Sequence, residues 1–189
     1  MLGLVASSGW ISAGMANAPL PHPRQLSELG AVLCCYRRRW GNELAGWDRA
    51  VRAQVRADDE QGTPECLLFF DQSGHCCWRL YLLPDTDFLA WDALVSGLPT
   101  VSSRPAKGLG RWWRKICDAW HDGRWDNCIV RLHDHSGSNG GCMLAASLGR
   151  ISVLGMKTAR RILRMERLGT RSAGMAEDDA ASGFALGRI

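Results

Sequence analysis

The chain has 189 residues, of which 46% are hydrophobic and 22% are charged, and its formal net charge is +4. These values are typical of a globular protein with one good core or one and a half small domains. No apolar run approaches the roughly 18 residues that a membrane-spanning helix needs. The eight cysteines include no Cys-x-x-Cys pair, which excludes a zinc ribbon and a thioredoxin motif.

Residues 1–23 are rich in Gly, Ser, Ala and Pro, and we expect a poorly ordered lead-in there. Ala16-Asn17-Ala18 imitates the cleavage site of a signal peptide. Against secretion, no Lys or Arg comes before Arg24, and Pro19 would follow the cleavage point directly. The simpler interpretation is a cytoplasmic protein with reduced cysteines.

The charges are distributed unevenly along the chain. Residues 1–100 hold 8 Lys and Arg against 11 Asp and Glu, whereas residues 101–171 hold 14 against 5. A basic second half indicates an anionic partner for that half.

The first elements are a short helix and a strand. Residues 26–36 predict a helix that passes Gly30 into a buried strand over residues 31–36. The arginines 37–39 that follow form either a solvated loop or a clamp for a carboxylate or phosphate. In residues 40–57 the apolar spacing favours an amphipathic helix, while a pair of strands interrupted at Gly46 stays open.

Two adjacent cysteine pairs fall on predicted strands, Cys34-Cys35 and Cys76-Cys77. Neighbours on a strand point to opposite faces, so we expect one thiol of each pair to be buried as a small apolar group.

Residues 66–98 predict a compact unit of strand, turn, strand and capped helix. The strands over 66–70 and 75–83 are rich in aromatic and apolar residues, and Asp71 to Gly74 suit the turn between them. Pro84 ends the second strand because it has no N–H for a ladder. Asp85 or Thr86 is expected to cap the helix, with Asp87 in its first turn and Phe88, Trp91, Leu94 and Val95 on its apolar face.

The remainder divides into a linker over 100–110, a basic Trp-rich α+β segment over 111–169 and a disordered tail over 170–189. A strand over 128–132 would place Cys128, Val130 and Leu132 on one face, and Ile129, Arg131, His133 and His135 on the other. A helix over 157–168 would place Ala159, Ile162 and Leu163 inward and Arg160, Arg164, Arg167 and Arg171 outward.

The unit over residues 66–98 resembles the repeat unit of the hemin-degrading factor (HemS-like) family of heme-utilisation proteins. The matching residues are Leu68-Phe69-Phe70-Asp71, Gly74, Leu80-Tyr81-Leu82, Thr86-Asp87 and Ala90-Trp91-Asp92-Ala93-Leu94-Val95. The resemblance implies an α+β fold with an antiparallel sheet flanked by helices and a single copy of the unit over 24–99. It also implies a half-length member that can form a homodimer.

The resemblance further implies a cytoplasmic heme carrier or a protein of heme degradation. Heme needs one or two axial ligands, apolar walls and cations for its propionates. Where the family commonly has a His-Lys pair, this chain has Cys77-Trp78-Arg79, which keeps the cation. The candidate heme-binding residues are His75, Arg79, His121, His133 and His135.

Three other interpretations stay open. The basic segment over 101–171 could bind nucleic acid or another polyanion through Trp112, Trp113 and the arginines 160, 164, 167 and 171. A degenerate relative could keep the fold without the ligand. His133-Asp134-His135 could ligate a metal, but the spacing identifies no third or fourth ligand. The sequence contains no nucleotide-binding, hydrolase or zincin motif, and whether the protein is an enzyme stays open.

Overall fold

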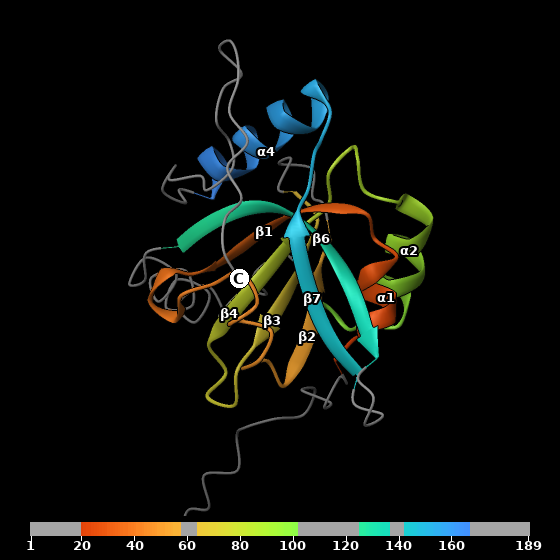
Figure 1. Cartoon of the computed structure of the whole chain (residues 1–189). Helices are drawn as coiled ribbons and strands as arrows, with labels where there is room; N and C mark the ends of the chain where they lie inside the picture. The colour runs from red at the N-terminus through yellow and green to blue at the C-terminus, as the bar shows by residue number, and fades with distance from the viewer. Residues whose placement is uncertain (1–19, 58–63, 102–124, 137–141, 167–189) are drawn as a thin grey trace, which may run out of the picture.

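The computed structural model describes residues 20–57, 64–101, 125–136 and 142–166. A seven-stranded sheet of order β5-β2-β3-β4-β1-β6-β7 forms its centre (Figure 1). The strands are β1 (Ala31–Arg37), β2 (Arg52–Arg56), β3 (Cys66–Phe70), β4 (Cys76–Tyr81), β5 (Thr100–Val101), β6 (Trp125–Ser136) and β7 (Cys142–Leu148). The described helices are α1 (Pro23–Ser27), the 3₁₀ turn η1 (Arg38–Trp40), α2 (Phe88–Ser96) and α4 (Val153–Met165).

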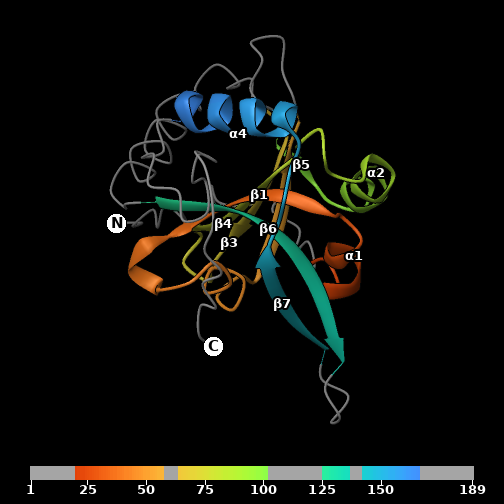
Figure 2. The same ribbon diagram turned by 45° about the horizontal axis from the view of Figure 1, so that its top comes forward.

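Six strands pair antiparallel, and only β5 runs parallel to its neighbour β2. Leu26 of α1 and Trp91 of α2 pack on one face of the sheet, which we call the α1/α2 face. Ile162 and Leu163 of α4 pack on the other, the α4 face (Figure 2). The predicted α+β class, an antiparallel sheet flanked by helices, is therefore confirmed.

The strands and turn predicted over residues 66–83 are present. The Oδ1 atom of Asp71 accepts a hydrogen bond from the His75 backbone N–H at 2.9 Å, which closes the turn between β3 and β4. Gly74 has φ of 79°, a conformation that costs glycine little because it has no Cβ. The turn therefore forms for the local reasons that the sequence indicated.

The cap of α2 differs from the prediction. Asp87 is the N-cap, and its side chain accepts from the Ala90 N–H at 3.0 Å. Thr86 is instead buried, where its hydroxyl donates to the carbonyl of Ala31. Of the expected apolar face, Trp91 and Leu94 are buried, but Phe88, the first residue of α2, is 52% exposed.

Residues 40–57 form neither a helix nor a pair of strands. After η1 the chain makes turns and then one strand, β2. Ala53 and Val55 of β2 face the α1/α2 side, and Arg56 faces the α4 side. Pairing with β3 therefore overrides the helical spacing of the apolar residues.

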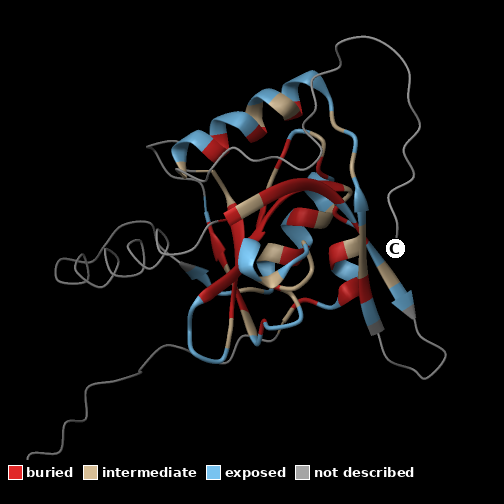
Figure 3. Ribbon diagram, turned by 60° about the vertical axis from the view of Figure 1, so that its left-hand side comes forward, coloured by how far each residue is buried: buried red, intermediate tan, exposed pale blue. Residues whose placement is uncertain are grey.

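Both thiols of each adjacent cysteine pair are buried, so the expectation of one buried thiol per pair is wrong. Cys34 and Cys77 pack on the α1/α2 face, and Cys35 and Cys76 pack on the α4 face. Opposite directions are as predicted, but the sheet is covered on both sides. Figure 3 shows this burial along the central strands.

The basic segment contributes β6 and β7 to the same sheet as residues 31–101, since β6 pairs with β1 from Trp125 to Arg131. The predicted burial of Ala159, Ile162 and Leu163 on α4 is confirmed. Several predictions fall outside the described residues: those for 1–19, 58–63, 102–124, 137–141 and 167–189.

The start of α4 is tied to the loop before α2. Ser152 caps α4, and the carboxylate of Asp85 accepts from the Ser152 N–H at 2.7 Å and from its hydroxyl at 3.0 Å. Gly155 in the first turn lies so close that a Cβ there would stand 2.0 Å from Oδ2 of Asp85. A side chain at residue 155 would therefore displace the Asp85 carboxylate.

We predict that Gly155→Ala destabilises the protein by about 1–2 kcal/mol, the scale of charged hydrogen bonds, although Ala is the better helix former by about 1 kcal/mol. In an Asp85→Ala background the same change should stabilise, because no carboxylate remains to displace. Urea unfolding measures both, with Gly97→Ala as the control since Gly97 has ordinary space around it. Equal effects of Gly155→Ala in the two backgrounds would contradict the contact.

Candidate functional site

The α4 face holds a buried arginine cluster, which consists of Arg56, Arg79 and Glu166. Glu166 directly follows α4, and its carboxylate forms salt bridges with Arg56 and, at 3.4 Å, with Nη1 of Arg79. The three side chains are only 7%, 1% and 8% exposed, so water screens these charges little. The cluster therefore fastens the C-terminal end of α4 to strands β2 and β4.

Aromatic rings adjoin this cluster. The guanidinium carbon of Arg79 lies 4.2 Å from the centroid of the Trp125 ring, and that of Arg37 lies 4.5 Å from it. Burial raises the pKa of Tyr81 well above its usual range, so its hydroxyl stays protonated near Arg79. The arrangement stabilises buried cations, and it leaves Arg79, a predicted heme-binding residue, fully buried.

The cysteine thiols on the α4 face are buried and unreactive. Burial raises the pKa of Cys66 to about 12 and also raises that of Cys35 above its ordinary value. Because the thiolate is the nucleophile and the metal ligand, protonated buried thiols do neither at neutral pH. The structure describes the side chains of six cysteines, and all six are buried and unbridged.

The same sheet face continues beyond α4 onto the hairpin of β6 and β7, where it is open. Arg131, His133 and His135 are exposed there, on the side of β6 predicted from alternation. Their direct partners across the ladder are Ser147, Ala145 and Met143, respectively. We call these six residues the hairpin face.

Side chains on the hairpin face differ in their partners. Nε2 of His133 lies 2.7 Å from Oγ of Ser147, which fixes the orientation of that ring. His135 makes no such bond among the described residues and stands beside Met143, whose side chain is 66% exposed. The face therefore offers an oriented imidazole, an open imidazole, a thioether and a guanidinium over small side chains.

The other predicted ligands lie elsewhere. His75 is on the turn between β3 and β4, with 66% of its side chain exposed, 3.8 Å from the Asp71 carboxylate. His121 lies outside the described residues. The structure thus brings His133 and His135 together and separates them along the chain and sheet from the His75 turn.

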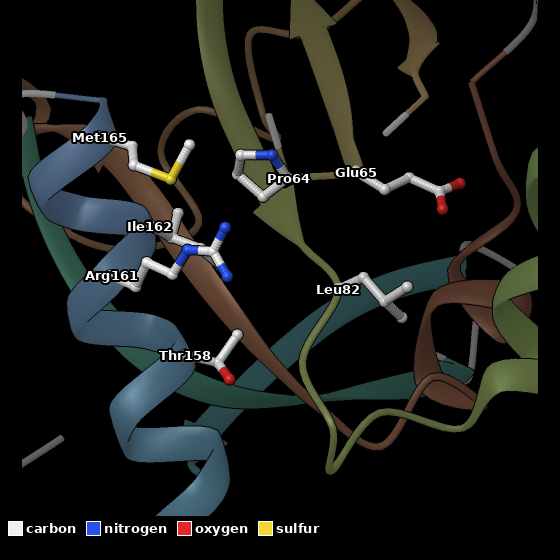
Figure 4. Close-up of a pocket in the computed structure, with 7 residues that line it drawn as sticks. All are labelled: Pro64, Glu65, Leu82, Thr158, Arg161, Ile162 and Met165. Carbon is white, nitrogen blue, oxygen red and sulfur yellow. The ribbon is translucent and has the colours of Figure 1, made fainter. Parts of the chain in front are cut away.

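A small pocket of about 240 Å³ lies between α4 and the ends of β3 and β4 (Figure 4). Arg161 reaches across it toward Pro64, while the Glu65 carboxylate points away and accepts from Nε1 of Trp91. No histidine of the described ranges lines this pocket, and its volume is below the roughly 300–1,000 Å³ typical of ligand pockets. Its lining residues are Pro64, Glu65, Leu82, Thr158, Arg161, Ile162 and Met165.

Aromatic residues on the α1/α2 face fill the core. The ring of Phe69 lies 4.8 Å from that of Trp78 and 6.0 Å from that of Trp47. Nε1 of Trp78 donates to the carbonyl of Glu43 at 2.6 Å, so the polar end of this buried ring is satisfied. These aromatics therefore serve packing.

The outer face of α4 carries a basic stripe: Lys157, Arg160, Arg161 and Arg164, all exposed. Their spacing of three and four residues places them on one side of the helix. No carboxylate of the described residues lies within salt-bridge distance of any of them. Arg167 and Arg171, which were predicted to continue the stripe, lie outside the described part of the chain.

Within the described ranges there is no group of three or more His, Cys, Asp or Glu side chains placed to hold a metal ion. Within the same ranges, no helix is both long and apolar enough to cross a lipid bilayer.

Sequence reasoning missed two features of these sites. The pairing of Met143 with His135 depends on the register of β6 and β7, which alternation alone does not determine. The salt bridges of Glu166 could not be predicted either, because 110 and 87 residues separate Glu166 from Arg56 and Arg79.

Comparison with protein-family models, curated proteins and solved structures finds no match to this chain. The functional proposals therefore rest on the residues of this chain and their geometry.

We predict that Glu166→Gln lowers the free energy of unfolding by about 2–4 kcal/mol, because it removes the charge that two buried guanidiniums share. The matched control is Glu28→Gln, whose partner Arg24 is exposed and whose loss should cost about 0–0.5 kcal/mol. Guanidinium denaturation monitored by circular dichroism measures both. Similar losses in the two variants would show that the cluster does not fasten α4.

Proposed function

We propose that this protein binds heme in the cytoplasm and serves heme uptake or utilisation, as a carrier or in heme breakdown. The observation that carries the proposal is the hairpin face, which exposes two imidazoles, a thioether and a guanidinium on one sheet surface. The resemblance of residues 66–98 to the HemS-like unit supports the same ligand class.

The chemistry of the hairpin face suits heme. Heme iron takes His or Met as axial ligands, and its propionates pair with cations such as Arg131. Ala145 and Ser147 are small, so a flat macrocycle could approach the strands closely. The buried cysteine thiols and Tyr81 are inaccessible as ligands, which leaves His133, His135 and Met143 on this surface.

Of the two histidines, His135 is the better axial ligand. Nε2 of His133 is already engaged with Ser147, whereas the ring of His135 makes no hydrogen bond within the described part of the chain. We assign ligation to His135 and a positioning role to His133. Any redox or ring-opening chemistry would come from the iron and porphyrin, with the protein supplying ligation and shape.

We predict a saturable shift of the Soret band when hemin is titrated into the protein at micromolar concentration. His135→Ala should weaken binding at least about tenfold, or about 1.4 kcal/mol, and change the ligand-dependent spectrum. His133→Ala should weaken binding less and leave the spectrum type unchanged. His75→Ala is the matched control, since this side chain is exposed on the turn between β3 and β4.

An unsaturable titration would overturn the heme proposal. A saturable titration in which His135→Ala binds as tightly as the unmodified protein would instead overturn the assignment to the hairpin face.

The basic stripe on α4 favours a second candidate function, the binding of nucleic acid or another polyanion. Four exposed cations without a carboxylate partner among the described residues create a local positive potential that attracts phosphates. Glu166, which follows α4, is turned inward and does not neutralise the stripe. Salt dependence tests whether the stripe contacts phosphates, because such contacts release counterions.

For this candidate we predict binding to a fluorescent DNA duplex whose log affinity falls with log salt at a slope of about −3.6, or −0.9 per contacted phosphate. The variant Lys157→Gln/Arg160→Gln/Arg164→Gln should reduce the magnitude of the slope by about 2.7. The control Arg38→Gln/Arg39→Gln/Arg49→Gln removes three charges from another surface. Equal losses in both variants would show that net charge, and not α4, governs binding.

A further inference from the structure

Strand β7 is a long outer edge of the sheet. The sheet ends at β7, and no other described strand pairs with its outer side. Its inner side forms a seven-residue ladder with β6, from Cys142 to Leu148. Figures 1 and 2 show β7 beside β6 as the second strand of the hairpin. Half of its backbone N–H and C=O groups therefore point away from the sheet.

This edge lacks the usual protection against pairing. Natural edges carry charges, proline or bulges, or are very short. The opposite edge strand, β5, has this protection, because it is only two residues long and directly follows Pro99. By contrast, β7 has the sequence Cys-Met-Leu-Ala-Ala-Ser-Leu, with no charge and no proline.

Two large apolar side chains of β7 are left in solvent. Met143 is 66% exposed and Leu148 is 71% exposed. They project on opposite faces of the strand, since their positions differ by an odd number. A strand added at the edge would lie beside both side chains, whereas a ligand bound to one face would contact only one of them.

We propose that β7 pairs antiparallel with β7 of a second copy of this chain, which joins the two sheets into one. A two-fold axis through Ala145 places Met143 opposite Ser147 and Leu144 opposite Ala146 of the second copy. Leu148 then lies opposite Cys142. Because β7 carries no charge, no like charges meet at the axis, and the small side chains at its centre let the strands approach.

The nearest charged strand, β6, lies one strand away from the axis. Its copies would stand three strand spacings apart, about 14 Å, so repulsion between Arg131 residues is screened by water and salt. The interface consists of one seven-residue ladder and is small, which predicts a concentration-dependent dimer in the micromolar range.

Pairing would also enlarge the hairpin face. The row His133, Ala145, Ala145 of the second copy and His133 of the second copy would cross the joined sheet on one surface. Imidazoles of both copies would then flank a floor of alanines. The use of this floor for heme rests on the proposed function, whereas the pairing itself does not.

Sedimentation velocity of the full chain without ligand, over about 1–100 µM, tests the pairing. The unmodified protein should shift from monomer to dimer. Ala145→Lys should weaken dimerisation at least tenfold, because it places two cations at the axis. The control Leu89→Lys adds the same charge at an exposed apolar site on α2, 81% exposed, and should dimerise normally.

A crosslink locates the interface directly. In a background where Cys117 and Cys142 are serine, Ala145→Cys should form a covalent dimer on mild oxidation, since residues opposite each other on antiparallel strands have Cβ atoms about 4.5–5.5 Å apart. Leu89→Cys in the same background should remain uncrosslinked. A monomer at every concentration overturns the proposal, as does a dimer that Ala145→Lys leaves intact and Ala145→Cys fails to trap.

This test is independent of heme. Circular dichroism of Ala145→Lys separates loss of pairing from loss of folding. A failed hemin titration with an intact dimer would overturn only the proposed function.

Discussion

The carboxylate of Glu166 is the constraint on which the α4 face depends. It lies between the guanidiniums of Arg56 and Arg79, which come from strands two positions apart in the sheet order. Burying an arginine is costly without a countercharge, and α4 supplies one at its C-terminal end. At its other end Ser152 is held by Asp85. The helix is thus fixed by polar contacts at both ends and by apolar packing between them.

The position of α4 divides one sheet face into two environments. Under the helix, arginines, thiols and Tyr81 are buried, and their chemistry is structural. Past the helix, β6 continues with the same alternation, and the same side of the strand becomes exposed at Arg131, His133 and His135. The functional proposals therefore concern the hairpin and the outer side of α4, where side chains are available to a partner.

Local signals in the sequence predicted most of the fold. The strands and turn over 66–83 follow from apolar runs and Gly74, and the inward residues of α4 follow from helical spacing. The helix favoured over residues 40–57 does not form. Their apolar spacing is helical, but pairing with β3 makes residues 52–56 a strand. The side of β6 that bears the histidines was predictable from alternation. The salt-bridge partner of Arg79, Glu166, was not predictable, because the contact depends on where α4 packs on the sheet.

Strand β6 pairs with β1 along its first half and with β7 along its second half. Strand β1 pairs with β6 as far as Arg131, whereas β7 pairs with β6 from Val130 to Ser136. The outer half of the hairpin therefore extends past β1, and among the described elements α1 packs against it. Leu132 and Leu144 of this half are nevertheless buried in the core cluster that also contains Leu26 of α1. Packing under the overhang therefore holds the hairpin face in place, while its α4 side stays open to a partner.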